Sequence, residues 1–245
     1  MRLLFLFLAA WWLIFPGCGD LPEDSPLSDI VIDDASVIQP MVELTRSIND
    51  QGSVTVRFEV RLRDKNGNYI KLKDGGVQVN GFKLGIKYDH SAPYYQLLSS
   101  DSTLMKTGQL MTVLITLGDG SDYALTGYAP PKALKKISAP DSVSRNNNIV
   151  ITWQEVDSIF PQEIELKRYF KTSEDHYSNA TDMFKIESPE QGRYFIYSPL
   201  LQEFPNTYKI IVKLISTRYG KIPKDFRSGG YFHAMFTISK IVKIY

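Results

Sequence analysis

Few side chains in this sequence of 245 residues have the type and spacing that catalysis or metal binding needs. Cys18 is the only cysteine, and the three histidines, His90, His176 and His233, lie in separate segments. Zinc sites bring several such ligands together at short spacings, so we expect no metal site. His233 falls in an expected strand, where it points to solvent or fills a core edge rather than acting as a base.

Other catalytic motifs are missing from the sequence. It contains no Gly-x-Ser-x-Gly elbow, no phosphate loop and no dinucleotide fingerprint. The segment Asp119-Gly120-Ser121-Asp122 lacks the glutamate at position twelve of a calcium loop, which favours a hairpin turn. Acidic neighbours such as Asp33-Asp34 are expected in solvated loops. We therefore expect neither an enzyme nor a bound cofactor.

Adjacent tyrosines are the best candidates for ligand contact. Tyr94 and Tyr95 follow Pro93 in an expected loop, and flat aromatic rings stack well on sugar faces. Trp153 is better explained as a core residue. The sequence thus predicts a ligand surface at Tyr94 and Tyr95, with a glycan or a protein as the partner.

The N-terminus has the pattern of a secretion signal. Met1-Arg2 supplies a positive charge, and residues 3–15 form an uninterrupted apolar run that ends just before Gly17 and Cys18. Thirteen residues are too few for a helix that spans a bilayer, which needs about 20. The pattern predicts a signal peptide over residues 1–17 that is cleaved before Cys18.

Gly17-Cys18 resembles the lipidation site of bacterial lipoproteins. The resemblance implies that the Cys18 thiol carries fatty acyl chains such as palmitate, which anchor the protein to a membrane. An uncleaved membrane anchor with a buried thiol is the alternative. Residues 18–28 form an acidic, proline-containing tether that resembles those of Bacteroidetes-type surface lipoproteins. That resemblance implies the outer membrane, with exposure at the cell surface.

Composition and charge narrow the choice of partners. Aromatic residues make up 12% of the chain, which favours strands, and the formal net charge is +1. Such a balance provides no basic field for nucleic acid, so we expect no nucleic-acid partner.

Residues 29–130 read as a series of short strands. Apolar and polar residues alternate from Ser53 to Arg63, as in a strand with one buried face. Turn signals follow at Asn66-Gly67, Asn80-Gly81 and Asp119-Gly120. We expect returning strands at 69–72 and 123–128, with Met111, Val113, Ile115 and Leu117 on one face. The pattern predicts a β-sandwich.

A second strand series occupies residues 137–245, after a boundary at Ala129-Pro130-Pro131. Ala139-Pro140 followed by Ile149 to Trp153 resembles the opening of a fibronectin type III domain. Leu201 to Tyr208 is similar to the tyrosine corner of that family, and the last strand is expected over 231–241. The chain is thus predicted to be all-β, with two tandem immunoglobulin-like or fibronectin III-like sandwich domains after the signal peptide and tether.

Three short motifs resemble the O-glycosylation signal of Bacteroidetes envelope proteins. They begin at Asp101, Asp141 and Asp157, and each places a serine second. The candidate modified residues are Ser102, Ser142 and Ser158.

These patterns lead to three hypotheses about function. The first is a membrane-anchored, non-enzymatic binding or spacer module of the cell envelope. The second is a carbohydrate-active enzyme or a glycan-binding accessory subunit. The third is a structural subunit of an envelope assembly that is built by strand addition.

Overall fold

The structure is a computed structural model that describes residues 34–131, 136–154, 162–173, 176–188, 192–203 and 206–245. Cys18, the predicted signal peptide and the predicted tether lie outside the described residues. Most of the described chain is in strands, and α1 (Ser198–Gln202) is its one short α-helix. None of the described helices is long and apolar enough to cross a membrane.

The first half of the chain contains eight strands and two 3-10 turns. They are η1 (Ala35–Val37), β1 (Gln39–Ile48), β2 (Val54–Arg63), β3 (Gly76–Val79), β4 (Phe82–Lys83), β5 (Gly85–Asp89), β6 (Ala92–Ser99), η2 (Ser102–Leu104), β7 (Leu110–Thr116) and β8 (Asp122–Tyr128).

The second half supplies eight more strands around α1. They are β9 (Lys136–Ser138), β10 (Ser142–Val143), β11 (Ile149–Gln154), β12 (Gln162–Lys171), β13 (Tyr177–Ile186), β14 (Arg193–Ile196), β15 (Thr207–Tyr219) and β16 (Tyr231–Ile244).

One long sheet runs through both halves of the molecule. Its strand order is β13-β12-β15-β16-β1-β2-β6-β5, and β10 pairs with the end of β16. The central pair is parallel: Met41 to Ile48 of β1 lie beside Tyr231 to Ile238 of β16. The remaining pairs along this order are antiparallel. The first and last long strands of the chain are therefore direct neighbours.

A four-stranded sheet covers the first half of the long sheet. Its order is β4-β3-β7-β8, and the apolar side chains of both sheets meet in one core. The expected face of β7 is confirmed, because Met111, Val113, Ile115 and Leu117 are all fully buried. Phe232, Ala234 and Phe236 of β16 belong to the same core. The last strand therefore completes the packing of the first half.

A three-stranded sheet covers the second half of the long sheet. Its order is β14-β11-β9, and its inner face packs on β12, β15 and the end of β16. Trp153 of β11 is buried in this second core, as the sequence predicts. Ile238, Val242 and Ile244 of β16 lie there too. One 14-residue strand thus contributes to both cores, and the expected tandem arrangement of two independent domains is not confirmed.

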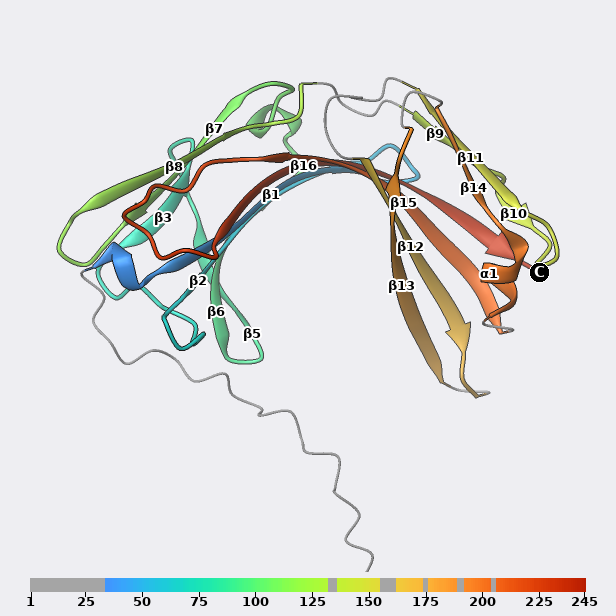
Figure 1. Ribbon diagram of the computed structural model, residues 1–245, viewed down its shortest axis with the longest axis horizontal. Coiled ribbons are helices and arrows are strands. Elements are labelled where there is room, and N and C mark those ends of the chain that lie inside the picture. Colours follow the sequence, from blue (N-terminus) through green and yellow to red (C-terminus); the bar gives the residue numbers. More distant parts are fainter. Residues whose placement is uncertain (1–33, 132–135, 155–161, 174–175, 189–191, 204–205) are drawn as a thin grey trace, which may run out of the picture.

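The long sheet is bent into an arch (Figure 1). The two smaller sheets lie on its outer side, so the other face of the long sheet lines the concave side. On β2 the alternation is clear: Val56, Phe58, Val60 and Leu62 are buried in the core, whereas the intervening polar residues face the concavity.

Close contacts join the two halves beside the core. Thr126 of β8 exchanges two backbone hydrogen bonds with Lys221, which lies just beyond β15. Gly127 and Gly220 flank the ring of Phe232, and a Cβ on Gly220 would lie 2.4 Å from that ring. The absence of side chains at these two glycines lets β8 and the end of β15 approach each other.

The predicted turns form where expected. Asn80 and Gly81 have positive φ angles of 48° and 84°, and Gly67 and Gly120 have φ angles of 85° and 86°.

The predicted returning strand at residues 69–72 is wrong. Pairing with β2 stops after its first two residues: Tyr69 bridges to Arg63, and the Ile70 amide donates to the Leu62 carbonyl at 2.9 Å. The side chains of Ile70 and Leu72 are buried in the core. The Leu72 amide donates instead to the Tyr95 hydroxyl, at 2.8 Å.

The predicted tyrosine corner is also wrong at Tyr208. The register between β12 and β15 shifts so that Tyr169 lies opposite Lys209 while the next residue, Phe170, lies opposite Thr207. The extra residue is a bulge, which leaves Tyr208 pointing outward with 39% of its surface exposed. The last strand, in contrast, is confirmed and extends to Ile244.

Candidate functional site

A group of polar and aromatic side chains lies on the concave face of the long sheet. Five strands supply them, in the order β6, β2, β1, β16 and β15. The cross-strand register brings them together: Glu59 lies opposite Gln96 on one side and Glu43 on the other. Glu43 in turn lies opposite His233, and His233 opposite Tyr219.

Carboxylates and guanidinium groups form the centre of the site. Arg61 Nε donates to Glu59 Oε1 at 2.9 Å, and Gln96 Nε2 donates to Glu59 Oε2 at 3.4 Å. Arg57 lies between Glu43 and Glu59, 3.9 Å from each carboxylate. The charges of this group are therefore largely compensated within the group itself.

Aromatic rings form one end of the site. The Tyr231 hydroxyl donates to Glu43 Oε1 at 2.9 Å, and its ring stacks on the His233 imidazole with centroids 4.5 Å apart. Tyr219 contacts His233 edge-on, with centroids 5.0 Å apart, and is 58% exposed. Tyr219 therefore offers a ring face to solvent.

Partial burial shifts the pKa values of Tyr231 and His233, the two titratable groups that stack on each other at this end of the site. Burial, together with the hydrogen bond to the Glu43 carboxylate, raises the pKa of Tyr231 to about 12. Burial also lowers the pKa of His233, against the opposing influence of Glu43 and Glu163. At neutral pH the imidazole is therefore uncharged and packs as an aromatic ring against two tyrosines.

The two tyrosines singled out from the sequence lie on opposite faces of β6. Tyr94 lies on the concave face, where the Arg61 guanidinium sits 4.9 Å from its ring centroid. Tyr95 is only 2% exposed and fills the first core. Its expected exposure is wrong, because adjacent strand residues point to opposite faces and β6 is a strand, not a loop. Tyr94 remains a candidate ligand contact.

A continuous chain of contacts crosses the face. We call it the contact chain: Tyr94, Arg61, Glu59, Arg57, Glu43, Tyr231, His233 and Tyr219. It crosses four strand spacings, or about 19 Å. The rings offer stacking faces, the carboxylates accept hydrogen bonds and the guanidinium groups donate them. Such a surface is suited to holding an extended ligand.

Sequence reasoning missed most of the contact chain. Alternation on β2 marks Arg57, Glu59 and Arg61 as facing one side of the sheet, and alternation around His233 gives the same information for β16. The missing information is that β1 pairs with β16 in parallel across the whole chain, which no local pattern reveals.

The remaining candidates are scattered. Ser102 begins η2, where the Asp101 carboxylate accepts from the Thr103 amide at 2.8 Å, and Ser142 is exposed on β10. Ser158 and Cys18 lie outside the described residues. His90 and His176 are exposed and stand apart from His233, and the described residues contain no group of three metal-ligating side chains.

Comparison with known proteins gives no match. The sequence matches no protein-family model and none of the curated proteins. The residues themselves must carry the functional argument.

Proposed function

We propose that this protein is a membrane-anchored, non-enzymatic binding module of a bacterial cell envelope, with the contact chain as its ligand surface. The anchor is the acylated Cys18, at the end of a secretion signal over residues 1–17. The outer membrane is the proposed location.

The contact chain is the observation that carries this proposal. Eight side chains from five strands contact one another in sequence, although they come from positions as distant as Glu43 and Tyr231. A solvated sheet face needs no such arrangement, because isolated surface ion pairs contribute only about 0–1 kcal/mol to stability. Exposed Tyr219 and half-buried Tyr94, at its two ends, are the stacking positions.

The arrangement of strands supports a fibronectin III-like assignment for the second half. The strands β9, β11 and β14 form one sheet, and the long strands β12, β13, β15 and β16 belong to the other. Trp153 on β11 fills the core between them, as the resemblance implies. Such sandwiches often serve as binding or spacer modules, although the fold alone does not define the ligand.

A glycan is the ligand type that the contact chain favours, which keeps the accessory-subunit hypothesis open. Aromatic faces next to charged hydrogen-bonding groups are suited to sugars, whose rings have apolar faces and hydroxyl edges. Array binding that is lost in Tyr219→Ala and Tyr94→Ala, and kept in the matched control Tyr128→Ala, would support this form. If the protein hydrolyses a glycan and Glu43→Gln loses this activity, the binding hypothesis would be rejected in favour of a carbohydrate-active enzyme.

The membrane anchor has a direct test. Cells grown with a clickable fatty acid should label the wild-type protein and should not label Cys18→Ser, with Ser102→Ala as the control that keeps its label. Protease shaving of intact cells then reports exposure at the surface. Equal labelling of the wild type and Cys18→Ser would refute the anchor at this residue.

A further inference from the structure

Lysines and tyrosines alternate on the concave face of the second half. The Lys167 and Lys209 ammonium groups lie 5.6 and 4.1 Å from the Tyr169 ring centroid. Lys209 also lies 5.9 Å from the Tyr208 ring. These contacts hold two positive charges over one ring, in the favourable arrangement of a cation–π pair.

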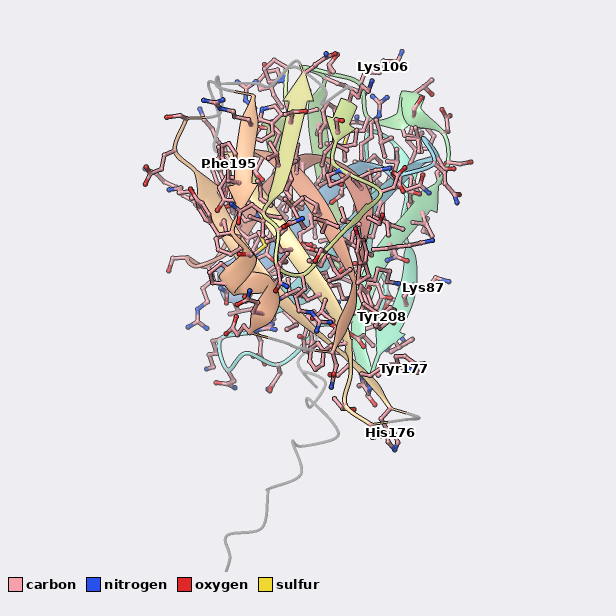
Figure 2. All side chains as sticks on the ribbon, turned by 90° about the vertical axis from the view of Figure 1, so that its right-hand side faces the viewer. Lys87, Lys106, His176, Tyr177, Phe195 and Tyr208 are labelled. Carbon is pink, nitrogen blue, oxygen red and sulfur yellow. The ribbon has the colours of Figure 1, made fainter. Side chains whose placement is uncertain are left out.

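The alternation continues to the end of β12. Tyr208 meets Tyr177 edge-on at 5.8 Å, and Lys171 lies 5.5 Å from the Tyr177 ring. Figure 2 shows Tyr208 and Tyr177 close together at the lower end of the second half, with His176 beyond them at the tip. Lys243 of β16 lies directly opposite Lys209. We call Lys167, Lys171, Lys209 and Lys243 the lysine cluster.

The lysine cluster forms no ion pair among the described residues. None of their carboxylates lies within ion-pair distance of these four ammonium groups. On the concave face, Glu165 is already engaged, because it pairs with Lys213 at 2.7 Å. Asp182 and Glu203 pair with Arg168, which is buried on the core face of β12. Asp141 acts on Lys243 at longer range, but its carboxylate is bound by Lys240 at 2.7 Å.

An arrangement of this kind works against folding stability. Like charges directly opposite each other on neighbouring strands are destabilising, and Lys209 and Lys243 are such a pair. In the contact chain on the same face, by contrast, Arg57 and Arg61 are matched by carboxylates. An anionic ligand would supply the missing charge.

We infer that the lysine cluster binds an acidic glycan, whose carboxylate or phosphate groups meet the ammonium groups and whose sugar rings stack on Tyr177 and Tyr208. Both rings are exposed, at 59% and 39%. The cluster lies on a concave sheet face, which a single flexible chain reaches more easily than a flat bilayer does. This site is separate from the contact chain, so each can be tested without the other.

The test is a titration of the full mature protein with polygalacturonate, in which isothermal calorimetry measures binding at 50 and 300 mM salt. Neutral dextran, vesicles of anionic phosphatidylglycerol and a DNA duplex are titrated in parallel. The variants are Lys167→Gln/Lys209→Gln and Lys243→Gln. Lys106→Gln is the matched control, since Lys106 is exposed at the opposite end of the molecule (Figure 2).

The inference predicts binding of polygalacturonate, weakened about tenfold or more in the double variant and by the higher salt, with Lys106→Gln unchanged. The melting temperature of Lys243→Gln should be equal to or above that of the wild type, because a like-charge contact is removed. Absence of polygalacturonate binding overturns the inference, as does equal binding by the double variant. Tighter binding to vesicles or DNA through the same lysines overturns the glycan as the ligand. None of these outcomes depends on Tyr219 or Tyr94, the stacking positions of the proposed function.

Discussion

Tyr231 is the residue at which the polar and aromatic ends of the contact chain meet. Its hydroxyl donates to Glu43 and its ring stacks on His233, so it fixes two neighbours at once. These two neighbours come from strands that are far from each other in the sequence. The geometry of the site therefore depends on this one side chain.

We predict that Tyr231→Phe lowers the free energy of unfolding by about 1 kcal/mol, the usual contribution of one hydrogen bond. The ring that stacks on His233 is kept, so the decrease in the free energy of unfolding is due to the hydroxyl alone. Urea denaturation measures this free energy. The matched control is Tyr88→Phe, since Tyr88 is 54% exposed. An unchanged midpoint in Tyr231→Phe would show that the bond to Glu43 contributes nothing.

His233 predicts how stability changes on the acid side of neutrality. Its pKa is lowered by burial from the ordinary value of 6.5, so the folded state resists a proton that the unfolded chain accepts. The contribution of His233 to the free energy of unfolding should therefore be fully present above pH 6.5 and should be lost as the pH falls below that value. Thermal melts from about pH 7.5 to about pH 5.5 should show a smaller decline in His233→Gln than in the wild type. His90→Gln is the control, because that side chain is 94% exposed; an equal decline in all three proteins would contradict the assignment.

At the scale of elements, the sequence predicts strands well and their partners poorly. Alternation correctly marks β2 and the inner face of β7, and Asn80-Gly81 correctly marks a turn, because these signals are local. The failures come from tertiary context. Tyr95 is buried because β6 replaces an expected loop, and Tyr208 is turned outward by a bulge that no composition signals.

The glycines where β8 meets the end of β15 are essential to the junction of the two halves. A Cβ on Gly220 would lie 2.4 Å from the Phe232 ring and 2.8 Å from the Thr126 carbonyl oxygen. We expect Gly220→Ala to lower the free energy of unfolding by about 1–3 kcal/mol through overpacking. Gly76→Ala is the control, because a Cβ at that position would have no neighbouring atom within 4 Å. Equal stability of Gly220→Ala and Gly76→Ala in a denaturant titration would show that the junction is loose.

The whole molecule is organised around β16. Its first residues pack in one core and its last residues in the other, and its parallel pairing with β1 makes the two sandwiches share one sheet. Composition and turns predict the all-β class, yet no local feature predicts that residue 231 returns to residue 41. The candidate site has the same limit, since three of its side chains come from β15 and β16.

A shared strand predicts that the two halves unfold together. Calorimetry of the protein should give one transition in which the calorimetric and van't Hoff enthalpies agree. Deleting residues 231–245 should unfold the first half as well as the second, because Phe232 and Phe236 leave the first core. Two separate transitions, or a first half that keeps its structure after this deletion, would identify independent domains.

The most direct test of the central claim is hydroxyl-radical footprinting of the protein in the cells that produce it, compared with the purified protein. If the concave face holds the ligand, Tyr94, Tyr219 and Tyr231 should be protected in the cells, while the exposed Tyr128 and Tyr197, which adjoin the outer sheets, react equally in both samples. Protection of Tyr128 and Tyr197 alone, with the concave tyrosines unchanged, would contradict the claim and move the ligand surface to the outer side of the arch.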